Sequence, residues 1–245
     1  MKKAFIPLVF ILVLISFALC GFGGPAPNTP PLPSDNQGEM TPSQPGSAPE
    51  VYRIDEFNDG DYTTPEWWKF DNVTPTVVSN SSYTGGDPNS EIAVGPYSLN
   101  IKGKATNWYA GGMGTYFAKP KTNYSSYNAL QMDIFGNGPG SGTLKIEFLD
   151  DDNGNWQAEQ DPKRSYAPIY DDVWKYELNI NWKGWKKVTI PFADFEDANP
   201  GVGDDIWNPD QKGGSGGLLQ IQLIALGPKK DGTVNFNVDN VMLVK

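Results

Sequence analysis

Apolar and polar side chains alternate along much of the chain after residue 50, and no stretch there keeps the 3.6-residue spacing of an amphipathic helix. In the segment 97–102, Tyr97, Leu99 and Ile101 alternate with polar residues. The same period of two recurs in segments 130–134, 144–148, 174–180, 219–225 and 234–238. Because successive side chains of a strand point to opposite faces of a sheet, each segment predicts a strand with one buried side.

Further strands are predicted from apolar content in segments 51–57, 75–79, 113–118 and 185–192. Turn-forming pairs separate the segments, namely Gly111-Gly112, Asn137-Gly138, Asn153-Gly154 and Asp231-Gly232. About ten short strands, each with one apolar side, predict an all-β fold of two antiparallel sheets packed face to face, a jelly-roll sandwich.

The last predicted strand changes its pattern near its end. Apolar side chains occupy even positions as far as Val238 and odd positions at Val241 and Leu243. A one-residue change of phase predicts a bulge or register shift at Asp239-Asn240.

The N-terminal residues 1–20 have the pattern of an export signal. Lys2 and Lys3 precede an uncharged run, 4–20, that is short for a membrane span. The run ends in Phe-Ala-Leu-Cys followed by Gly, which resembles a bacterial lipobox, although Leu19 departs from the small residue expected there. We therefore expect Cys20 to be lipidated, with ordinary cleavage or an uncleaved anchor as alternatives. Either way the protein is predicted to be extracytoplasmic, as a cell-envelope lipoprotein or a secreted protein.

Residues 21–50 contain eight prolines and few large apolar side chains. Such a segment buries too little surface to offset the entropy of ordering it, so a disordered, semi-extended linker is predicted. The folded domain is expected to span residues 51–245. A lipid anchor at the N-terminus would then be the only membrane attachment.

Composition narrows the chemistry. The chain has no histidine, which excludes a Ser-His-Asp system and His-ligated zinc. One cysteine among 245 residues excludes an internal disulfide and a Cys-clustered metal site. The formal net charge of −10 argues against nucleic acid as a partner, because phosphate binding needs clustered Lys and Arg.

Several motifs occur in an order that resembles a known family. They are Ile-Asp-Glu-Phe-Asn-Asp-Gly at 54–60, Tyr-Ser-Leu-Asn-Ile-Lys-Gly at 97–103, the Gly-rich aromatic segment 108–117, Trp-Lys-Lys-Val-Thr-Ile-Pro-Phe at 185–192, and Val-Asp-Asn-Val at 238–241. Across 51–245 this succession resembles galactose-binding-like jelly rolls of the family 11 carbohydrate-binding-module type. The resemblance implies binding of β-glucan-like chains on one sheet and a structural calcium ion.

The resemblance places calcium between an acid after the opening Phe and an Asp near the C-terminus. The matching positions here are Asn58, Asp59 and Asp239, with Asn58 in place of the usual Glu. Calcium takes six to eight oxygen ligands, which these residues would supply in part. The alternative is an acidic edge that only limits aggregation. A second acidic run, 150–154, fails the EF-hand spacing, and we expect a solvated hairpin turn there.

Sugar rings offer flat C–H faces bordered by hydroxyls, so a binding face needs exposed aromatic rings beside polar side chains. Candidates from glycine-rich segments and polar strand faces are Trp108, Tyr109, Tyr116, Gln131, Asp133, Glu147, Trp156, Tyr166, Tyr170, Trp182, Gln220 and Gln222. Trp68, Trp174 and Trp185 are expected in the core. The alternative is an ordinary polar surface, since every sandwich has one.

Binding without catalysis is the function that these patterns favour. A glycoside hydrolase needs two suitably spaced carboxylates, and no Glu-x-Asp-x-Glu strand occurs. We expect a surface-tethered or secreted module that binds polysaccharide or oligosaccharide, working beside a glycoside hydrolase or a transporter. Two alternatives stay open: a structural or adhesive envelope protein with the same fold, and a jelly-roll glycoside hydrolase or polysaccharide lyase.

Overall fold

The computed structural model describes residues 51–86, 92, 94–118, 122–164, 166–210 and 217–245. Its strands are β1 (Val51–Asp55), β2 (Trp68–Asp71), β3 (Val73–Ser79), β4 (Tyr97–Lys104), β5 (Tyr109–Tyr116), β6 (Ala129–Asn137), β7 (Gly142–Asp151), β8 (Gln160–Asp161), β9 (Ala167–Pro168), β10 (Asp172–Ile180), β11 (Lys183–Pro191), β12 (Glu196–Asp197), β13 (Gly217–Leu226) and β14 (Thr233–Val244). Short 3-10 turns lie at η1 (Asn80–Ser82), η2 (Pro162–Arg164) and η3 (Phe192–Asp194).

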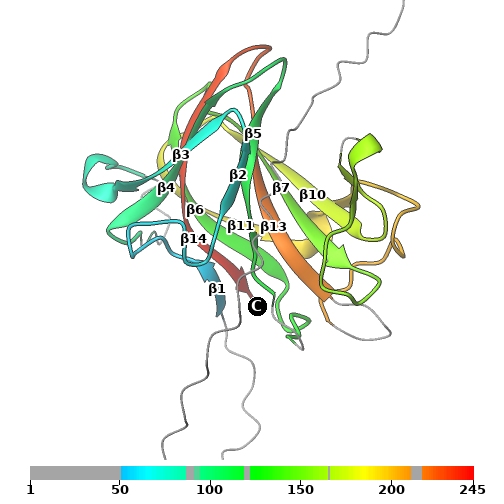
Figure 1. Cartoon of the computed structure of the whole chain (residues 1–245). Helices are drawn as coiled ribbons and strands as arrows, with labels where there is room; N and C mark the ends of the chain where they lie inside the picture. The colour runs from blue at the N-terminus through cyan, green and yellow to red at the C-terminus, as the bar shows by residue number, and fades with distance from the viewer. Residues whose placement is uncertain (1–50, 87–91, 93, 119–121, 165, 211–216) are drawn as a thin grey trace, which may run out of the picture.

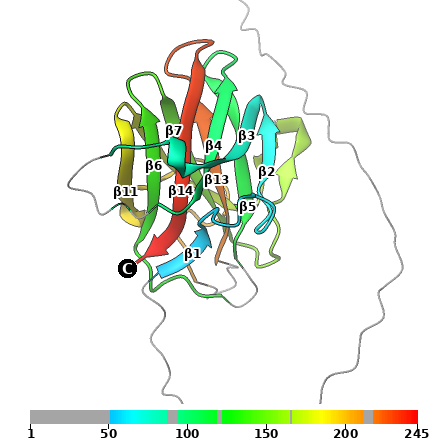
Figure 2. The same cartoon turned by 90° about the vertical axis from the view of Figure 1, so that its left-hand side faces the viewer.

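Two antiparallel sheets form the facing layers that Figure 1 shows. The platform sheet has the order β12-β10-β7-β13-β5-β2. The covered sheet has the order β11-β6-β14-β4-β3, with β1 beside the end of β14, and Figure 2 views it face-on. A separate ribbon joins β8 to β9. The prediction of an all-β, two-sheet jelly-roll sandwich is confirmed.

The core lies between the sheets and follows the predicted alternation. Leu144, Ile146 and Phe148 of β7 are fully buried. Phe148 is the centre of an aromatic cluster, with ring centroids 5.3–6.1 Å from those of Phe117, Phe192, Phe195 and Trp207. Burial of one side of each strand supplies most of the stabilisation of such a sandwich.

All ten strands predicted from the sequence are present, with ends that differ by a few residues. The sequence missed β2, which has only four residues and too short a pattern to detect. The predicted turn at Gly111-Gly112 is wrong, because both glycines lie inside β5. The predicted bulge is confirmed: the pairing of β14 with β6 shifts between Asp239 and Met242, and Asn240 has a φ of 51°.

The chain around η1 packs on the outer side of the covered sheet. Trp185 Nε1 donates to Tyr83 O at 2.8 Å, and the Tyr83 ring meets Phe135 at 5.1 Å. Asn80 Nδ2 donates to Gly95 O at 2.9 Å and to Asp239 Oδ2 at 3.3 Å. This segment leaves Asp239 without solvent exposure.

The predicted signal segment, 1–20, and the linker, 21–50, lie outside the described residues. Lipidation of Cys20 therefore stays a prediction, which labelling with a fatty-acid analogue would test. Within the part of the chain that the structure describes, none of the helical segments has the length and apolar character needed to span a bilayer.

Candidate functional site

One continuous row of residues crosses the outer side of the platform sheet. Trp68 of β2 lies opposite Gly114, Gly114 opposite Gln222, Gln222 opposite Glu147, and Glu147 opposite Lys175. Residues directly opposite one another in antiparallel strands point to the same face. The alternate residues, such as Leu223 and Ile146, belong to the core, so this row faces outward.

Two glycines give the aromatic part of this row its shape. A Cβ atom at Gly114 would lie 2.5 Å from Cζ2 of Trp68, and one at Gly112 would lie 2.6 Å from Cζ of Phe70. The two rings therefore rest on the backbone of β5. Tyr116 extends the aromatic surface, with its ring 5.1 Å from that of Trp68 and 48% of the residue exposed. We call Trp68, Phe70 and Tyr116 the ring platform.

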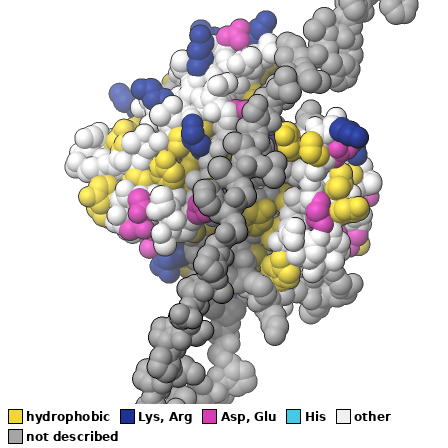
Figure 3. Space-filling model, viewed as in Figure 1, with side chains coloured by type: hydrophobic (Ala, Val, Ile, Leu, Met, Phe, Trp, Pro, Cys, Tyr) yellow, Lys and Arg dark blue, Asp and Glu magenta, His cyan; other side chains and the backbone are white. Residues whose placement is uncertain are grey.

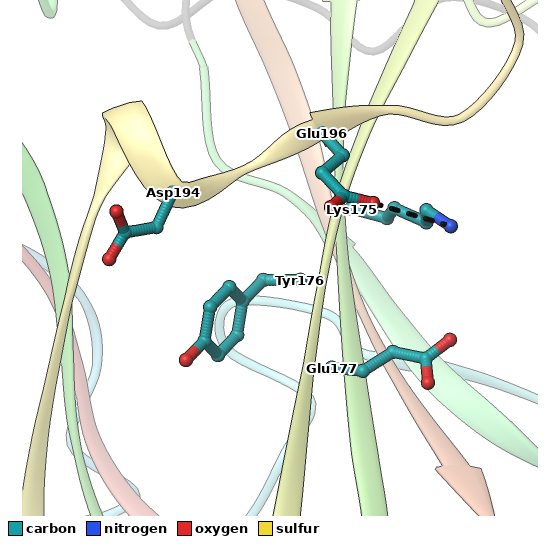
Figure 4. Close-up of a pocket in the computed structure, with 5 residues that line it drawn as sticks. All are labelled: Lys175, Tyr176, Glu177, Asp194 and Glu196. Carbon is teal, nitrogen blue, oxygen red and sulfur yellow. Dashed lines mark ion pairs between the residues drawn. The ribbon is translucent and has the colours of Figure 1, made fainter.

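Polar side chains continue the face beyond the ring platform. Lys145 Nζ lies 2.6 Å from Glu147 Oε1 on β7, and the pair is only partly exposed. At the far end, Lys175 Nζ lies 3.8 Å from Glu196 Oε2. A dashed line in Figure 4 marks this ion pair. Gln222 lies between the rings and these charges and is half-buried. The face thus passes from apolar rings through an amide to paired charges.

The tyrosines of this face are held neutral. Burial, together with the hydrogen bond of 2.6 Å from Tyr109 Oη to Asp71 Oδ2, raises the pKa of Tyr109 well above its usual value. Burial and the nearby carboxylates of Asp171 and Glu159 raise the pKa of Tyr116. Both phenols therefore act as neutral hydrogen-bonding groups at physiological pH.

An open depression of about 410 Å³ marks the end of the face near the turn before β5. Its lining includes Trp108, Thr143, Asn179 and Leu226, and Trp108 is 58% exposed.

On the face of the described residues seen in Figure 3, Lys and Arg side chains are scattered among hydrophobic and uncharged ones.

The structure brings together about half of the sugar-binding candidates. On the platform sheet or at its margin lie Trp108, Tyr109, Tyr116, Glu147, Gln220 and Gln222, although Gln220 is only 2% exposed. The remaining candidates lie elsewhere.

Gln131 and Asp133 belong to β6 of the covered sheet. Gln131 Nε2 donates to Thr189 at 3.0 Å, and buried Asp133 accepts from Asn240 at 2.7 Å. Trp182 follows β10, donates to Ile134 O at 3.3 Å and packs against the core. Trp156, Tyr166 and Tyr170 lie between β7 and β10.

Sequence reasoning missed the most informative ring. Trp68 was expected in the core, and the structure instead places it half-buried on the outer face. The available signal was the pair Gly112 and Gly114, two apart and therefore on one side of a strand. That spacing marks a place where another group approaches the backbone closely.

The residues that the family resemblance assigns to calcium meet only in part. Asn58 and Asp239 both contact Gly95: a Cβ at Gly95 would collide with Asn58 Oδ1, and Gly95 N donates to Asp239 Oδ2 at 3.3 Å. The other oxygen of Asp239 accepts from Asn240 N at 2.8 Å. Asp59 is exposed and accepts from Asp61 N. N–H groups thus lie around the Asp239 carboxylate, and the calcium ion expected at this place stays a prediction.

The acidic run 150–154 differs from the solvated turn expected there. Asp150 and Asp151 are fully buried. Asp151 accepts hydrogen bonds from the backbone N–H groups of Gly154 at 2.8 Å and Trp156 at 2.6 Å, which fold the chain after β7. The expectation is wrong for these two acids, because the strand continues through them to residue 151.

Replacing Gly114 by alanine is expected to displace the Trp68 ring, because ring atoms are the nearest neighbours of the added methyl group. We expect a loss of about 1–3 kcal/mol in unfolding free energy and a changed near-ultraviolet circular dichroism signal. The same change in a Trp68→Ala background is the control. There the methyl group meets no ring, so a loss of the same size in both backgrounds would contradict the arrangement.

Comparison with known proteins gives likenesses among solved structures only. No family model matches the chain, and no curated protein sequence matches it. A family 11 carbohydrate-binding module from Clostridium thermocellum, in complex with a β-1,3-1,4-mixed-linked tetrasaccharide, is similar at 17% identity and a TM-score of 0.49, over 81% of this chain and 97% of that one.

Two further solved structures are also similar. The family 11 module of the cellulosomal cellulase Lic26A-Cel5E of Clostridium thermocellum shows 16% identity and a TM-score of 0.44, over 81% of this chain and 96% of that one. The CBM22-2 xylan-binding domain of Paenibacillus barcinonensis Xyn10C shows 16% identity and a TM-score of 0.38, over 78% and 98%. The sequence resemblance to family 11 modules thus recurs among the solved structures.

Proposed function

We propose that this protein binds polysaccharide non-covalently on the outer face of the platform sheet, without breaking a bond. The observation that carries the proposal is the ring platform resting on Gly112 and Gly114, in line with Gln222 and Glu147 across the neighbouring strands. The Trp68 and Tyr116 rings, tilted by 40° to each other, present a shallow apolar surface. Sugars with equatorial hydroxyls, as in β-glucan chains, offer a matching C–H face.

Polar groups beside the rings supply the other half of such recognition. An amide both donates and accepts hydrogen bonds, as a row of hydroxyl groups requires. The Gln222 amide is followed by Glu147 and Lys175 in the same row. Partly buried charge pairs give stronger and more directional hydrogen bonds than a fully solvated surface. Ring stacking would thus contribute affinity, and the polar row would select the hydroxyl pattern.

The length of the row favours an extended ligand. Strands in a sheet lie about 4.8 Å apart, so the four intervals from Trp68 to Lys175 span roughly 19 Å. Trp108 and the depression beside Leu226 lie at one end of the same face. An extended oligosaccharide segment fits this surface better than a single sugar, which would leave most of the row without contact. We also propose, as the sequence predicts, that the protein is extracytoplasmic and tethered.

Calorimetric titration of the full chain with soluble mixed-linked β-glucan, xylan and mannan tests the proposal. We expect saturable heat with at least one of them, and unchanged reducing-end content after prolonged incubation. No heat with any member of a broad glycan array would refute sugar binding. Release of new reducing ends would instead indicate a hydrolase, the alternative that the sequence left open.

A further inference from the structure

The second acidic group of the molecule lies at the end of the core where β7 ends and β10 begins. Carboxylate oxygens of Asp152, Asp172 and Asp204 all lie within 4.8 Å of one another. They come from three separate segments: the chain just after β7, the first residue of β10, and the chain between β12 and β13. Asp150 lies opposite Asp172 in the β7–β10 pairing and adds a fourth acid.

Each buried acid uses one oxygen and leaves the other without a partner. The Oδ2 atoms accept backbone hydrogen bonds: Asp150 from Asn208 N at 2.5 Å, Asp152 from Asp172 N at 3.0 Å, and Asp172 from Ile206 N at 3.2 Å. The Oδ1 atoms of the same three residues are buried and accept no hydrogen bond among the described residues. Asp150 and Asp172 have no solvent exposure.

An arrangement of this kind is costly unless something neutralises it. A buried polar atom without a partner destabilises the fold, and more so when it is charged. The ion pairs of the described residues involve none of these four acids. Carboxylates this close together, two of them without solvent exposure, repel one another unless a cation lies between them.

We propose that Asp152, Asp172 and Asp204, with Asp150 beside them, bind a calcium ion that fixes the chain between β12 and β13 to the end of the core. This site is separate from Asn58, Asp59 and Asp239. It also does not depend on the sugar-binding proposal, because it concerns stability.

The ligand atoms and their spacing suit calcium. Calcium holds its oxygen ligands at about 2.3–2.6 Å, so two ligands of one ion lie at most about 5 Å apart, which the 4.8 Å limit satisfies. Magnesium holds ligands at about 2.0–2.1 Å in strict octahedral geometry and gives up its water reluctantly, so a cage of protein carboxylates suits it less than calcium. Three or four carboxylates also favour a hard divalent cation over a monovalent one.

The surrounding chain is shaped to this cluster. Gly203 has a φ of 76°, and a Cβ atom there would collide with Asp152 Oδ2 and Asp172 Oδ1. Trp207, four residues later, packs on Phe148 and on Trp174 with ring centroids 5.9 and 5.7 Å away. A bound ion would therefore hold in place the segment that closes the core with Trp207.

Calcium titration of the chelator-treated full chain tests the inference. We expect saturable binding by calorimetry and a rise in melting temperature of about 5–10 °C at a hundredfold excess over Kd, with a smaller rise for magnesium. Terbium bound at the site should emit on tryptophan excitation, because Trp207 is close in sequence, and calcium should displace it. No calcium heat and no change in melting temperature would overturn the inference.

Matched Asp→Asn variants locate the site. Asp172→Asn and Asp204→Asn are expected to weaken calcium binding at least tenfold, whereas Asp194→Asn, an exposed acid outside the cluster, retains the wild-type response. Asp204 is exposed, so its variant is decisive if Asp172→Asn fails to fold. An equal calcium response in Asp204→Asn and wild type, or its loss in Asp239→Asn alone, would refute the assignment.

Discussion

Phe148→Ala is expected to lower the unfolding free energy by about 3–5 kcal/mol, the largest stability effect of any single change considered. Phe148 is fully buried, and its ring meets those of Phe117, Phe192, Phe195 and Trp207. These partners come from the end of β5, from the η3 turn and from the chain before β13, so they cannot all move into the space left by one ring. For a domain of this size the melting temperature should fall by roughly 6–20 °C.

Urea unfolding followed by circular dichroism measures this loss, and two variants define its cause. Phe148→Leu keeps most of the volume and should cost less than half as much as the alanine variant. Tyr170→Ala removes an aromatic ring that is 54% exposed and should change stability by no more than about 0.5 kcal/mol. Similar losses in all three variants would mean that Phe148 is not the centre of the core.

Removing two rings of the platform should abolish measurable sugar binding. Trp68→Ala and Tyr116→Ala are each expected to weaken binding about thirtyfold, because truncating an aromatic ring that contacts the ligand costs about 2 kcal/mol. The double variant should lose at least a hundredfold. Since the two rings lie 5.1 Å apart, we expect the two effects to be coupled rather than strictly additive.

Calorimetry or affinity electrophoresis with the glycan that binds wild type measures the loss. Tyr97→Ala is the matched control, because Tyr97 is a partly exposed aromatic residue at the start of β4 in the opposite sheet. It should bind like wild type. Unchanged affinity in the double variant, with a normal melting temperature, would place any sugar site away from the ring platform.

The strands could be predicted from the sequence because burial on one side of a sheet imposes a period of two that any long strand reveals. Segment 174–180 has this pattern over its whole length and became β10. The bulge near Asp239 was predictable for the same reason, since a change of phase in the pattern is local information. By contrast, β2 has four residues, which is too few for a period to be recognised.

The binding face was only partly predictable, because it depends on which strands become neighbours. Gln222 and Glu147 are 75 residues apart in sequence and lie opposite each other only through the pairing of β13 with β7. The neighbouring sequence does not distinguish Gln222 from Gln131, because both alternate with apolar residues in a strand, and Gln131 belongs to the other sheet. The position of Trp68 depends on the glycines of β5. The sequence pattern predicts a turn at Gly111-Gly112 instead of a continuous strand there, so it does not reveal this dependence.

The acidic cluster at the end of the core was not predicted from the sequence either, because the local pattern indicates a different structure. A run of three aspartates reads as a solvated turn, because isolated carboxylates are rarely buried. Asp150 nevertheless lies on the core side of β7, in phase with Phe148, and Asp152 just after the strand meets Asp172 and Asp204 from distant segments. Such a cluster is visible only after the chain is folded.

The position of β14 determines when this protein can complete its fold during synthesis. This strand comes last in sequence among the strands of the two sheets, yet it lies between β4 and β6 and also pairs with β1 at residues 241–244. Until it emerges, β4 and β6 each lack a neighbour, and the first strand has no partner. A nascent chain that stops short of β14 therefore carries two open sheet edges, which favour pairing between chains. Long-range closure of this kind also makes folding slow, so the interval before β14 is synthesised is when the protein is most prone to aggregate.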